Sequence, residues 1–277
     1  MTASLFRCPH CGAPLEREGN LLRCPGRHSF DVAREGYVNL LPPNQKRSKD
    51  PGDGRDMVAA RSAFLGKGYY LPLREALEGL AVRLTGDIPA PVVVDSGCGE
   101  GWYTAGVHAA LTQAGRTPRM AGVDLSKYAL RRAARRLPEG EFAVASVYRL
   151  PLGEASADLL LNVFSPLAAA EFARVVRSGG WFLYVVPSAR HLWQMKEVLY
   201  PRPYENPVKV EDYPGFAYQG VTEIRETITL NERADIMALF GMTPYAWKTP
   251  REGVARLEGM DALATGIGFD IHCYRRA

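Results

Sequence analysis

Long apolar runs and a signal-type N-terminus are both missing from this sequence. No stretch approaches the ~20 consecutive apolar residues that a membrane span needs. The first residues also lack the apolar core of a secretory signal. Only five cysteines occur among 277 residues, and reduced thiols fit that composition. We therefore expect a cytoplasmic enzyme with no membrane partner.

A strong charge of either sign is also missing, since the formal net charge is only +4. Residues 1–50 carry eight Lys and Arg against five Asp and Glu, so 8 − 5 = 3 of the excess charges lie there. A basic end indicates an anionic partner, although an excess this small is also explained by solvation alone. The length suits one α/β domain with a small additional module.

What the sequence does contain, before residue 30, is a cluster of soft ligands. The spacing Cys8-x2-Cys11-x12-Cys24-x3-His28 places two close pairs on either side of a short hairpin, and proline and glycine in each pair favour tight turns. A disulfide would leave His28 unexplained, and a redox pair requires a βαβ pattern that does not follow. The pattern predicts Zn²⁺ with four protein ligands, which serves structure because no coordination position remains for substrate.

The chain divides into three predicted parts. Residues 1–40 form the zinc module, residues 41–90 a basic connector followed by two helices, and residues 91–277 a larger α/β domain. The connector combines proline, glycine and charge without apolar periodicity, which is typical of a loop. Its cations Lys46, Arg47 and Lys49 could contact an RNA backbone.

Strands and helices alternate after residue 90. Strands are expected within the segments 91–96, 119–126, 142–151, 157–166 and 181–188. Helices are expected after the first strand and over 127–137 and 167–180. This alternation predicts a doubly wound parallel sheet. The segments 222–230 and 268–277 look like two further strands around one helix, which form an antiparallel edge.

A glycine-rich turn follows the first strand of this domain in the order Asp-Ser-Gly-Cys-Gly-Glu-Gly. Gly97, Gly99 and Gly101 would let a ligand approach the backbone closely. A dinucleotide site would place the third glycine one residue later, and no Lys-Ser or Lys-Thr ends a P-loop. Asp95 opens the turn, and Asp124 ends the next strand where ribose hydroxyls would lie. This set suits a ligand with an amine and a ribose and no phosphate, namely S-adenosylmethionine.

The motif resembles the first motif of class I S-adenosylmethionine-dependent methyltransferases, which have a Rossmann-like sheet with an antiparallel C-terminal pair. A resemblance to one narrower family extends over nearly the whole chain. The zinc knuckles and the segments "FDVAREGYVNLLP", "KRSKDPGD", "DSGCGEGWYT", "ARVVRSGGW", "RHLWQMK" and "MTPYAW" are similar to those of bacterial 23S rRNA (guanine-N1)-methyltransferases, a family that includes macrolide-resistance enzymes. It implies methyl transfer to guanine N1 of 23S ribosomal RNA, an RNA-recognising zinc module and a homodimer.

The resemblance also implies cofactor contacts. They correspond to the glycine turn with Glu100, to Tyr70 in "GYYLP" and to His191 in "ARHLWQ". Without it, Tyr70 would be interpreted as a packing aromatic and His191 as a surface residue. Cys98 within the turn is better explained as a small packed residue than as a nucleophile.

The segment "NVFSP" at the end of the fourth strand is the candidate base pocket. Asn162 could hold the Watson–Crick edge of an extruded guanine and Phe164 could stack on it. The alternative is that Phe164 belongs to the core and Asn162 only ends the strand. No side chain identifies itself by spacing as the acceptor of the N1 proton.

Two further questions stay open in the sequence. Four arginines lie on one side of a predicted helix, at Arg131, Arg132, Arg135 and Arg136, where either phosphate contact or a solvated face accounts for them.

Two other functions also fit parts of the chain. One is a small-molecule C- or O-methyltransferase with an accessory zinc module, and the other is a nonenzymatic zinc RNA-binding protein.

Overall fold

The computed structural model of the chain describes residues 2–45, 51–208 and 212–277. Lys46, Arg47 and Lys49 lie outside the described residues, so their predicted role in RNA binding stays a prediction. No helix within the described ranges is both long and apolar enough to cross a membrane.

The N-terminal module is a small antiparallel sheet in the order β1-β2-β3-β4. Its strands are β1 (Thr2–Arg7), β2 (Pro14–Glu18), β3 (Leu21–Arg23) and β4 (Ser29–Asp31). The β2 and β3 strands form the predicted hairpin, which turns at Gly19 with φ +61°. Each expected ligand pair lies on a turn that flanks this hairpin.

The large sheet has eight strands in the order β11-β12-β10-β9-β6-β7-β8-β5. Their bounds are β5 (Tyr37–Asn39), β6 (Val92–Ser96), β7 (Arg119–Asp124), β8 (Glu141–Val144), β9 (Ala157–Val163), β10 (Val176–Pro187), β11 (Phe216–Leu230) and β12 (Leu263–Arg276). The strands from β10 to β5 pair in parallel, while β12 pairs antiparallel with both β10 and β11. The doubly wound sheet with an antiparallel C-terminal pair is therefore confirmed.

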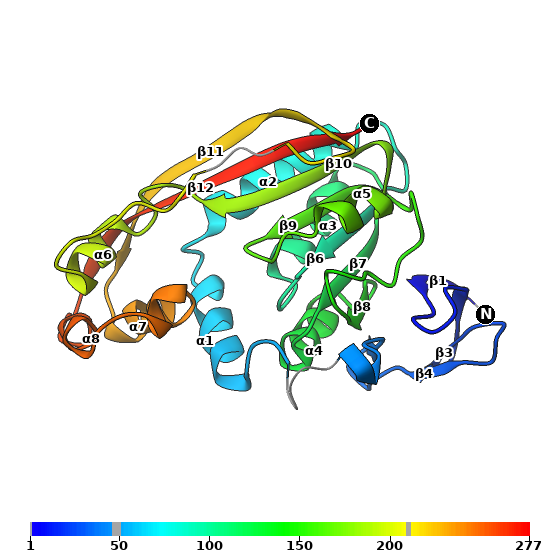
Figure 1. Ribbon diagram of the computed structural model, residues 1–277, viewed down its shortest axis with the longest axis horizontal. Helices are drawn as coiled ribbons and strands as arrows, with labels where there is room; N and C mark the ends of the chain where they lie inside the picture. Colours follow the sequence, from blue (N-terminus) through cyan, green and yellow to red (C-terminus); the bar gives the residue numbers. More distant parts are fainter. Residues whose placement is uncertain (1, 46–50, 209–211) are drawn as a thin grey trace.

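Most helices pack on one face of this sheet. They are α1 (Arg55–Gly66), α2 (Leu71–Leu84), α3 (Trp102–Gln113), α4 (Lys127–Arg136), α6 (Trp193–Leu199), α7 (Arg233–Gly241) and α8 (Arg251–Glu258). Short 3₁₀ turns occupy Pro43–Gln45 and Pro244–Trp247. Apolar side chains from these α-helices and from the sheet form one continuous core. Figure 1 shows α6 to α8 and the N-terminal module at opposite ends of the molecule.

The other face of the sheet has a different cover. Of the helices in the described residues, only α5 (Ala169–Val175) packs there, because the chain from β8 to β9 contains no helix. The N-terminal module lies over this part instead, and Phe6 of β1 pairs with Leu152 of the β8–β9 loop. Phe6, Leu15 and Leu22 belong to the same core cluster as α5 and the sheet. The small module therefore completes the hydrophobic core of the large domain.

Three features differ from the sequence prediction. β5 lies within residues 1–40, which were expected to form the zinc module, yet it forms the edge of the large sheet beside β8. The helix expected over residues 167–180 ends at Val175, where β10 begins, and the chain then bulges at Gly179, whose φ is +72°. Two α-helices, α7 and α8, lie between β11 and β12 rather than one, because Thr249-Pro250 interrupts the helical segment.

Candidate metal and cofactor sites

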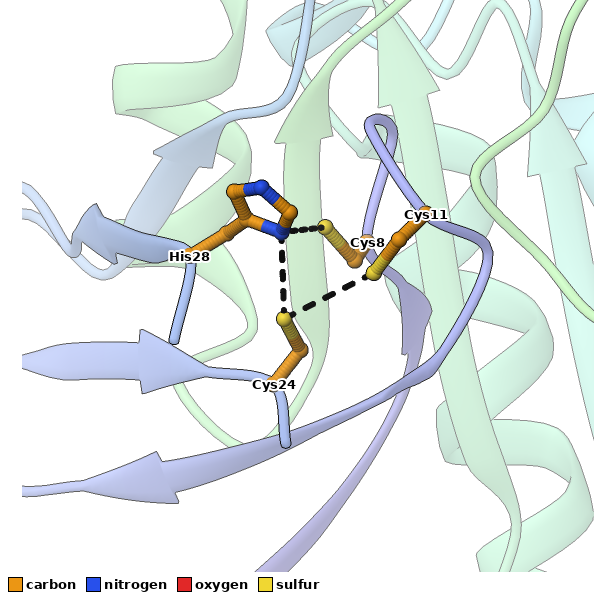
Figure 2. Close-up of side chains that lie close together, drawn as sticks. All are labelled: Cys8, Cys11, Cys24 and His28. Carbon is orange, nitrogen blue, oxygen red and sulfur yellow. Dashed lines mark hydrogen bonds between the residues drawn. The ribbon is translucent and has the colours of Figure 1, made fainter. Parts of the chain in front are cut away.

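The four predicted metal ligands converge at the base of the N-terminal module. Figure 2 shows Cys8 and Cys11 from the first turn facing Cys24 and His28 from the second. All four ligand atoms lie within 4.8 Å of one another. The Cys11 and Cys24 sulfurs are 3.7 Å apart, and His28 Nδ1 lies 3.5 Å from Cys8 Sγ and 3.4 Å from Cys24 Sγ.

These separations are those of a tetrahedral zinc site. With bonds of about 2.3 Å to sulfur and about 2.05 Å to nitrogen, a regular tetrahedron places ligand sulfurs about 3.8 Å apart and sulfur and nitrogen about 3.5 Å apart. These three separations therefore fit Zn²⁺, with Nδ1 as the coordinating atom of His28. Since four side chains close the coordination sphere, the metal stabilises this module rather than activating water.

The glycine turn, residues 97–101, joins β6 to α3 at the carboxyl end of the sheet. Gly97, Gly99 and Gly101 all have left-handed φ values, of +84°, +53° and +72°. A Cβ on Gly97 would overlap the side chain of Ser165, and one on Gly101 would lie 3.0 Å from Ala133 Cβ. A Cβ on Gly99, by contrast, would meet no protein atom within 4 Å. The backbone at Gly99 is therefore open to a ligand, while the other two glycines allow the turn to pack.

Asp95 is the penultimate residue of β6 and is fully enclosed, with 1% of its surface exposed. Its Oδ2 accepts a hydrogen bond of 2.6 Å from the Thr104 hydroxyl. Burial and, to a smaller extent, the nearby Asp124 raise the pKa of Asp95 to about 7, and the Thr104 bond opposes this shift. A cation that binds beside this buried carboxyl would stabilise its ionised form.

Asp124 ends β7 and holds the glycine turn from the other side. Its Oδ2 accepts from the Gly99 backbone N–H at 2.9 Å, and its Oδ1 accepts from the Ser126 N–H at 2.7 Å. Burial raises the pKa of Asp124, and these two bonds oppose the shift. Each oxygen still has a second lone pair with which to accept a ligand hydroxyl.

Several enclosed polar atoms near the turn have no hydrogen-bond partner among the described residues. They are Asp95 Oδ1, Ser96 Oγ, Glu100 Oε2, Tyr103 Oη and Asn162 Oδ1. Buried polar groups are normally paired, so such a group of atoms is typical of a site completed by a ligand. Both acceptors and hydroxyls are present, which suits an amino acid and ribose ligand such as S-adenosylmethionine.

The other two polar residues of the turn have structural partners. Glu100 is buried and forms an ion pair of 2.8 Å with Arg136 of α4. Burial raises the pKa of the Cys98 thiol well above its ordinary value. Cys98 is therefore a neutral packed thiol rather than a nucleophile, as expected.

Tyr70 and His191, which are far apart in sequence, contact the same aromatic residue. The ring centroids of Tyr70 and His191 lie 4.9 Å and 4.8 Å from that of Phe269 in β12. Burial lowers the pKa of His191 to about 3, so the imidazole is neutral. The Gly268 N–H donates to its Nδ1 at 3.2 Å, which places the ring proton on Nε2. His191 is thus buried rather than on the surface.

Asn162 and Phe164 lie at the end of β9, beside the turn. The Asn162 amide donates to the carbonyls of Ser96 and Pro166 at 3.3 Å and 3.2 Å. Phe164 has a left-handed φ of +53° and is 46% exposed, so it does not belong to the core. Its ring contacts Phe269 at a centroid distance of 5.4 Å. An exposed aromatic ring thus lies near the aromatic cluster of Tyr70 and His191.

Sequence reasoning missed three residues at this site. Thr104 and Tyr103 directly follow the glycine turn, and their place in the first helical turn after a ligand-binding loop could have indicated them. Phe269 had no such signal, because it comes from the last strand and reaches the site only through the β10–β12 pairing.

Two family models match the chain. Residues 6–49 match a zinc-ribbon family described as "RlmA, N-terminal". Residues 94–184 match a family described as "Methyltransferase domain". The first match contains the four clustered ligands, and the second contains the glycine turn, Asp124 and Asn162.

Proteins similar over nearly their whole length have been named by activity. A 23S rRNA (guanine(748)-N(1))-methyltransferase of Streptomyces fradiae is 38% identical, over 96% of this chain and 95% of its own. A Bacillus subtilis (strain 168) protein with a provisional 23S rRNA (guanine-N(1)-)-methyltransferase name, YxjB, is 33% identical over 97% and 96%. Among solved structures, YcgJ of Bacillus subtilis aligns with a TM-score of 0.50 and 16% identity, over 73% of this chain and 98% of its own, which bears on the fold alone.

Proposed function

The chain belongs to the 23S rRNA (guanine-N1)-methyltransferases, and we infer from this membership that it transfers a methyl group from S-adenosylmethionine to N1 of a guanine in 23S ribosomal RNA. The observation that carries this conclusion is identity of 33–38% over nearly the full length of relatives named for that activity. The zinc ribbon and the methyltransferase domain both lie within the matched length.

We propose that the cofactor binds across the glycine turn. The unpaired Asp95 Oδ1 would receive the cofactor's ammonium group, and Asp124 would accept from its ribose hydroxyls. The open backbone at Gly99 leaves room for close approach, while Glu100 holds the turn through Arg136. Tyr70 and His191 would enclose the cofactor from the side of β12.

When bound, S-adenosylmethionine supplies an electrophilic methyl group on its sulfonium. The protein's contribution is to place guanine N1 in line with that group, and positioning of this kind accounts for much of the catalysis in such transfers. The N1 proton must also leave. His191 does not accept it through Nδ1, because the Gly268 N–H already occupies that lone pair and Nε2 carries the ring proton. We assign His191 to positioning for this reason.

Asn162 and Phe164 are the proposed base pocket. Asn162 Oδ1 is buried and has no partner in the described structure, so it can accept a hydrogen bond from the Watson–Crick edge of guanine. Phe164 is held outside the core beside Asn162, where an extruded base could stack on its ring. Strand ends at this edge of an α/β sheet face the ligand crevice, which supports the same assignment.

The remaining features of the proposal concern context. We propose that the enzyme acts in the cytoplasm as a homodimer and that residues 1–40 contribute to RNA binding. We also propose that residues 1–40, 41–90 and 91–277 are three functional parts of the chain. The core shared by the N-terminal module and the sheet supports a module that acts together with the catalytic domain.

Reverse transcription of ribosomal RNA tests the function directly, because N1-methylation blocks the pairing edge and stops the polymerase. We expect the purified protein with S-adenosylmethionine to create one new stop at a guanine in a 23S rRNA transcript. An Asp124→Ala variant serves as the control and should create a much weaker stop. Methylation of small molecules without any stop in 23S rRNA would contradict the proposal and favour a metabolite methyltransferase.

A further inference from the structure

We propose that a pocket between α4, α1 and the N-terminal module binds backbone phosphates of the substrate RNA. This inference rests on the proposed function and adds a binding site to it. The pocket has a volume of about 630 Å³. Its cations are Arg55 of α1 and the four α4 arginines, Arg131, Arg132, Arg135 and Arg136. We call this site the arginine pocket.

Few carboxylates balance these cations. Glu35, from the turn before β5, lies 3.2 Å from Arg135 and 3.9 Å from Arg131. Glu100 of the glycine turn pairs with Arg136. Among the described residues, five guanidiniums against two carboxylates leave 5 − 2 = 3 positive charges around one cavity.

Among the described residues, two of the arginines have only neutral partners. Arg132 donates to the Ser62 hydroxyl at 3.0 Å, and the Arg55 guanidinium lies 5.7 Å from the ring centroid of Tyr128. Within the described residues, no carboxylate oxygen lies within 4.0 Å of either guanidinium. These two are therefore the guanidiniums best placed to receive an anion.

The solvated-face alternative accounts poorly for this arrangement. An exposed helix face usually alternates acids and bases, whereas α4 contains no acid at all. Its arginines stand at like-charge i, i+4 spacings, each of which destabilises a helix by roughly 0.2–0.5 kcal/mol. The helix dipole offsets only part of this at the last turn. An anion bound among the guanidiniums would remove the repulsion.

The charge and location of the pocket favour a polyanionic RNA strand. Guanidinium groups bind phosphate oxygens through paired, planar donors, and several of them around one cavity suit a chain of phosphates. Figure 1 shows α4 between α1 and the N-terminal module. The ion pair between Arg136 and Glu100 joins the pocket directly to the glycine turn. RNA bound here would therefore lie next to the cofactor loop and to the zinc module.

The test removes the two arginines that lack carboxylate partners, with the double variant Arg55→Gln and Arg132→Gln. This choice leaves Glu35 and Glu100 paired. The variant should raise the KM for a 23S rRNA transcript about tenfold, and should lower the slope of log affinity against log salt by about 1.5, the value for two lost phosphate contacts. Calorimetric affinity for S-adenosylmethionine should stay at the wild-type value.

The matched control is the double variant Arg202→Gln and Arg251→Gln, which removes the same charge from two exposed positions, after α6 and on α8. It should keep the wild-type KM and salt slope. If the pocket variant unfolds at a lower temperature, the two single variants are measured instead, and each should lower the slope by about half as much.

The outcomes separate the two proposals. A wild-type protein that methylates no guanine in 23S rRNA contradicts the proposed function itself. If the wild-type protein methylates 23S rRNA and the pocket variant has an unchanged salt slope of RNA affinity, only the arginine-pocket proposal is overturned. The variant could instead lose binding to pyrophosphate or to phosphatidylglycerol vesicles while the salt slope of its RNA affinity stays unchanged. That result would assign the pocket to another anion and would also overturn the proposal.

Discussion

Cofactor affinity should depend on pH through Asp95. In the absence of ligand, burial keeps the pKa of this carboxyl at about 7, and Oδ1 has no partner in the described structure. A bound ammonium group would stabilise the carboxylate and lower that pKa. Binding should then release a proton wherever the unliganded carboxyl is protonated, so affinity should rise as the pH rises towards 7.

The magnitude follows from the pKa of the unliganded protein. If the liganded carboxyl stays ionised throughout, affinity falls by about 15-fold between pH 7.0 and pH 5.5, which is ~1.6 kcal/mol. The cofactor's own amino group does not oppose this trend, since α-amino groups have pKa values of about 7.7–8.0 and stay protonated in that range. Cys98 and Tyr103, which face Asp95, stay neutral because burial raises their pKa values.

The same shift has a consequence for stability in the absence of cofactor. The unfolded chain loses the Asp95 proton near pH 3.8, whereas the folded chain keeps it until about pH 7. The unfolded state therefore binds fewer protons between these values, and the contribution of Asp95 to the free energy of unfolding falls as the pH rises from 4 to 7. Bound cofactor should reverse part of this loss.

Calorimetry provides the assay. Titration with S-adenosylmethionine at pH 5.5, 6.25 and 7.0 gives the affinity, and buffers of different ionisation enthalpy at pH 6.25 give the number of protons released. The control is Asp95→Asn, which keeps the shape and removes the titration, and its weaker affinity should be flat across the range. Equal wild-type affinities at pH 5.5 and 7.0, with no proton released, would refute the reasoning.

Three further predictions follow from contacts at the two sites. Cys24→Ser should release zinc and lower the unfolding temperature of the whole chain, since Cys24 belongs to a core shared with the sheet; metal analysis with scanning calorimetry checks this, and an unchanged main transition would contradict it. Gly101→Ala should lower the free energy of unfolding by about 1–2 kcal/mol because of its left-handed φ, and by more because of the contact with Ala133. Gly99→Ala should have only the left-handed φ cost and should chiefly weaken cofactor binding. Chemical denaturation measures the stability of each variant, and calorimetry measures its cofactor affinity. Asp124→Ala should weaken S-adenosylmethionine binding by about 1.5–3 kcal/mol, the range for a lost charge-assisted hydrogen bond, and wild-type affinity would place the ribose elsewhere.

The metal set and the glycine turn were predictable because each depends on residues close together in sequence. Cys8 and Cys11 share one turn, Cys24 and His28 another, and a single hairpin brings the turns together. The doubly wound parallel sheet was likewise confirmed, since alternating strands and helices leave few ways to arrange the chain. The helix bounds were predicted less accurately, since α5 ends at Val175 and β10 begins at Val176, where the helix was expected to continue.

The separation of the N-terminal module from the large domain could not be judged from sequence. Local patterns favoured an independent zinc unit. In the structure, Phe6 packs under the β8–β9 loop and β5 becomes an edge strand of the main sheet. Deleting residues 1–50 would therefore remove both a strand and part of the core, so point variants are the better test of the module.

The sequence alone determined which chemical groups this protein has, because turn geometry and ligand spacing are fixed by a few neighbouring residues. Only the tertiary structure decided which of them meet. Phe269 joins Tyr70 and His191 across some 80 to 200 residues of chain, and Arg55 joins the α4 arginines across a helix boundary. These long-range contacts result from the burial of apolar surface. Because that driving force is non-directional, no single position in the sequence indicates which residues will come into contact.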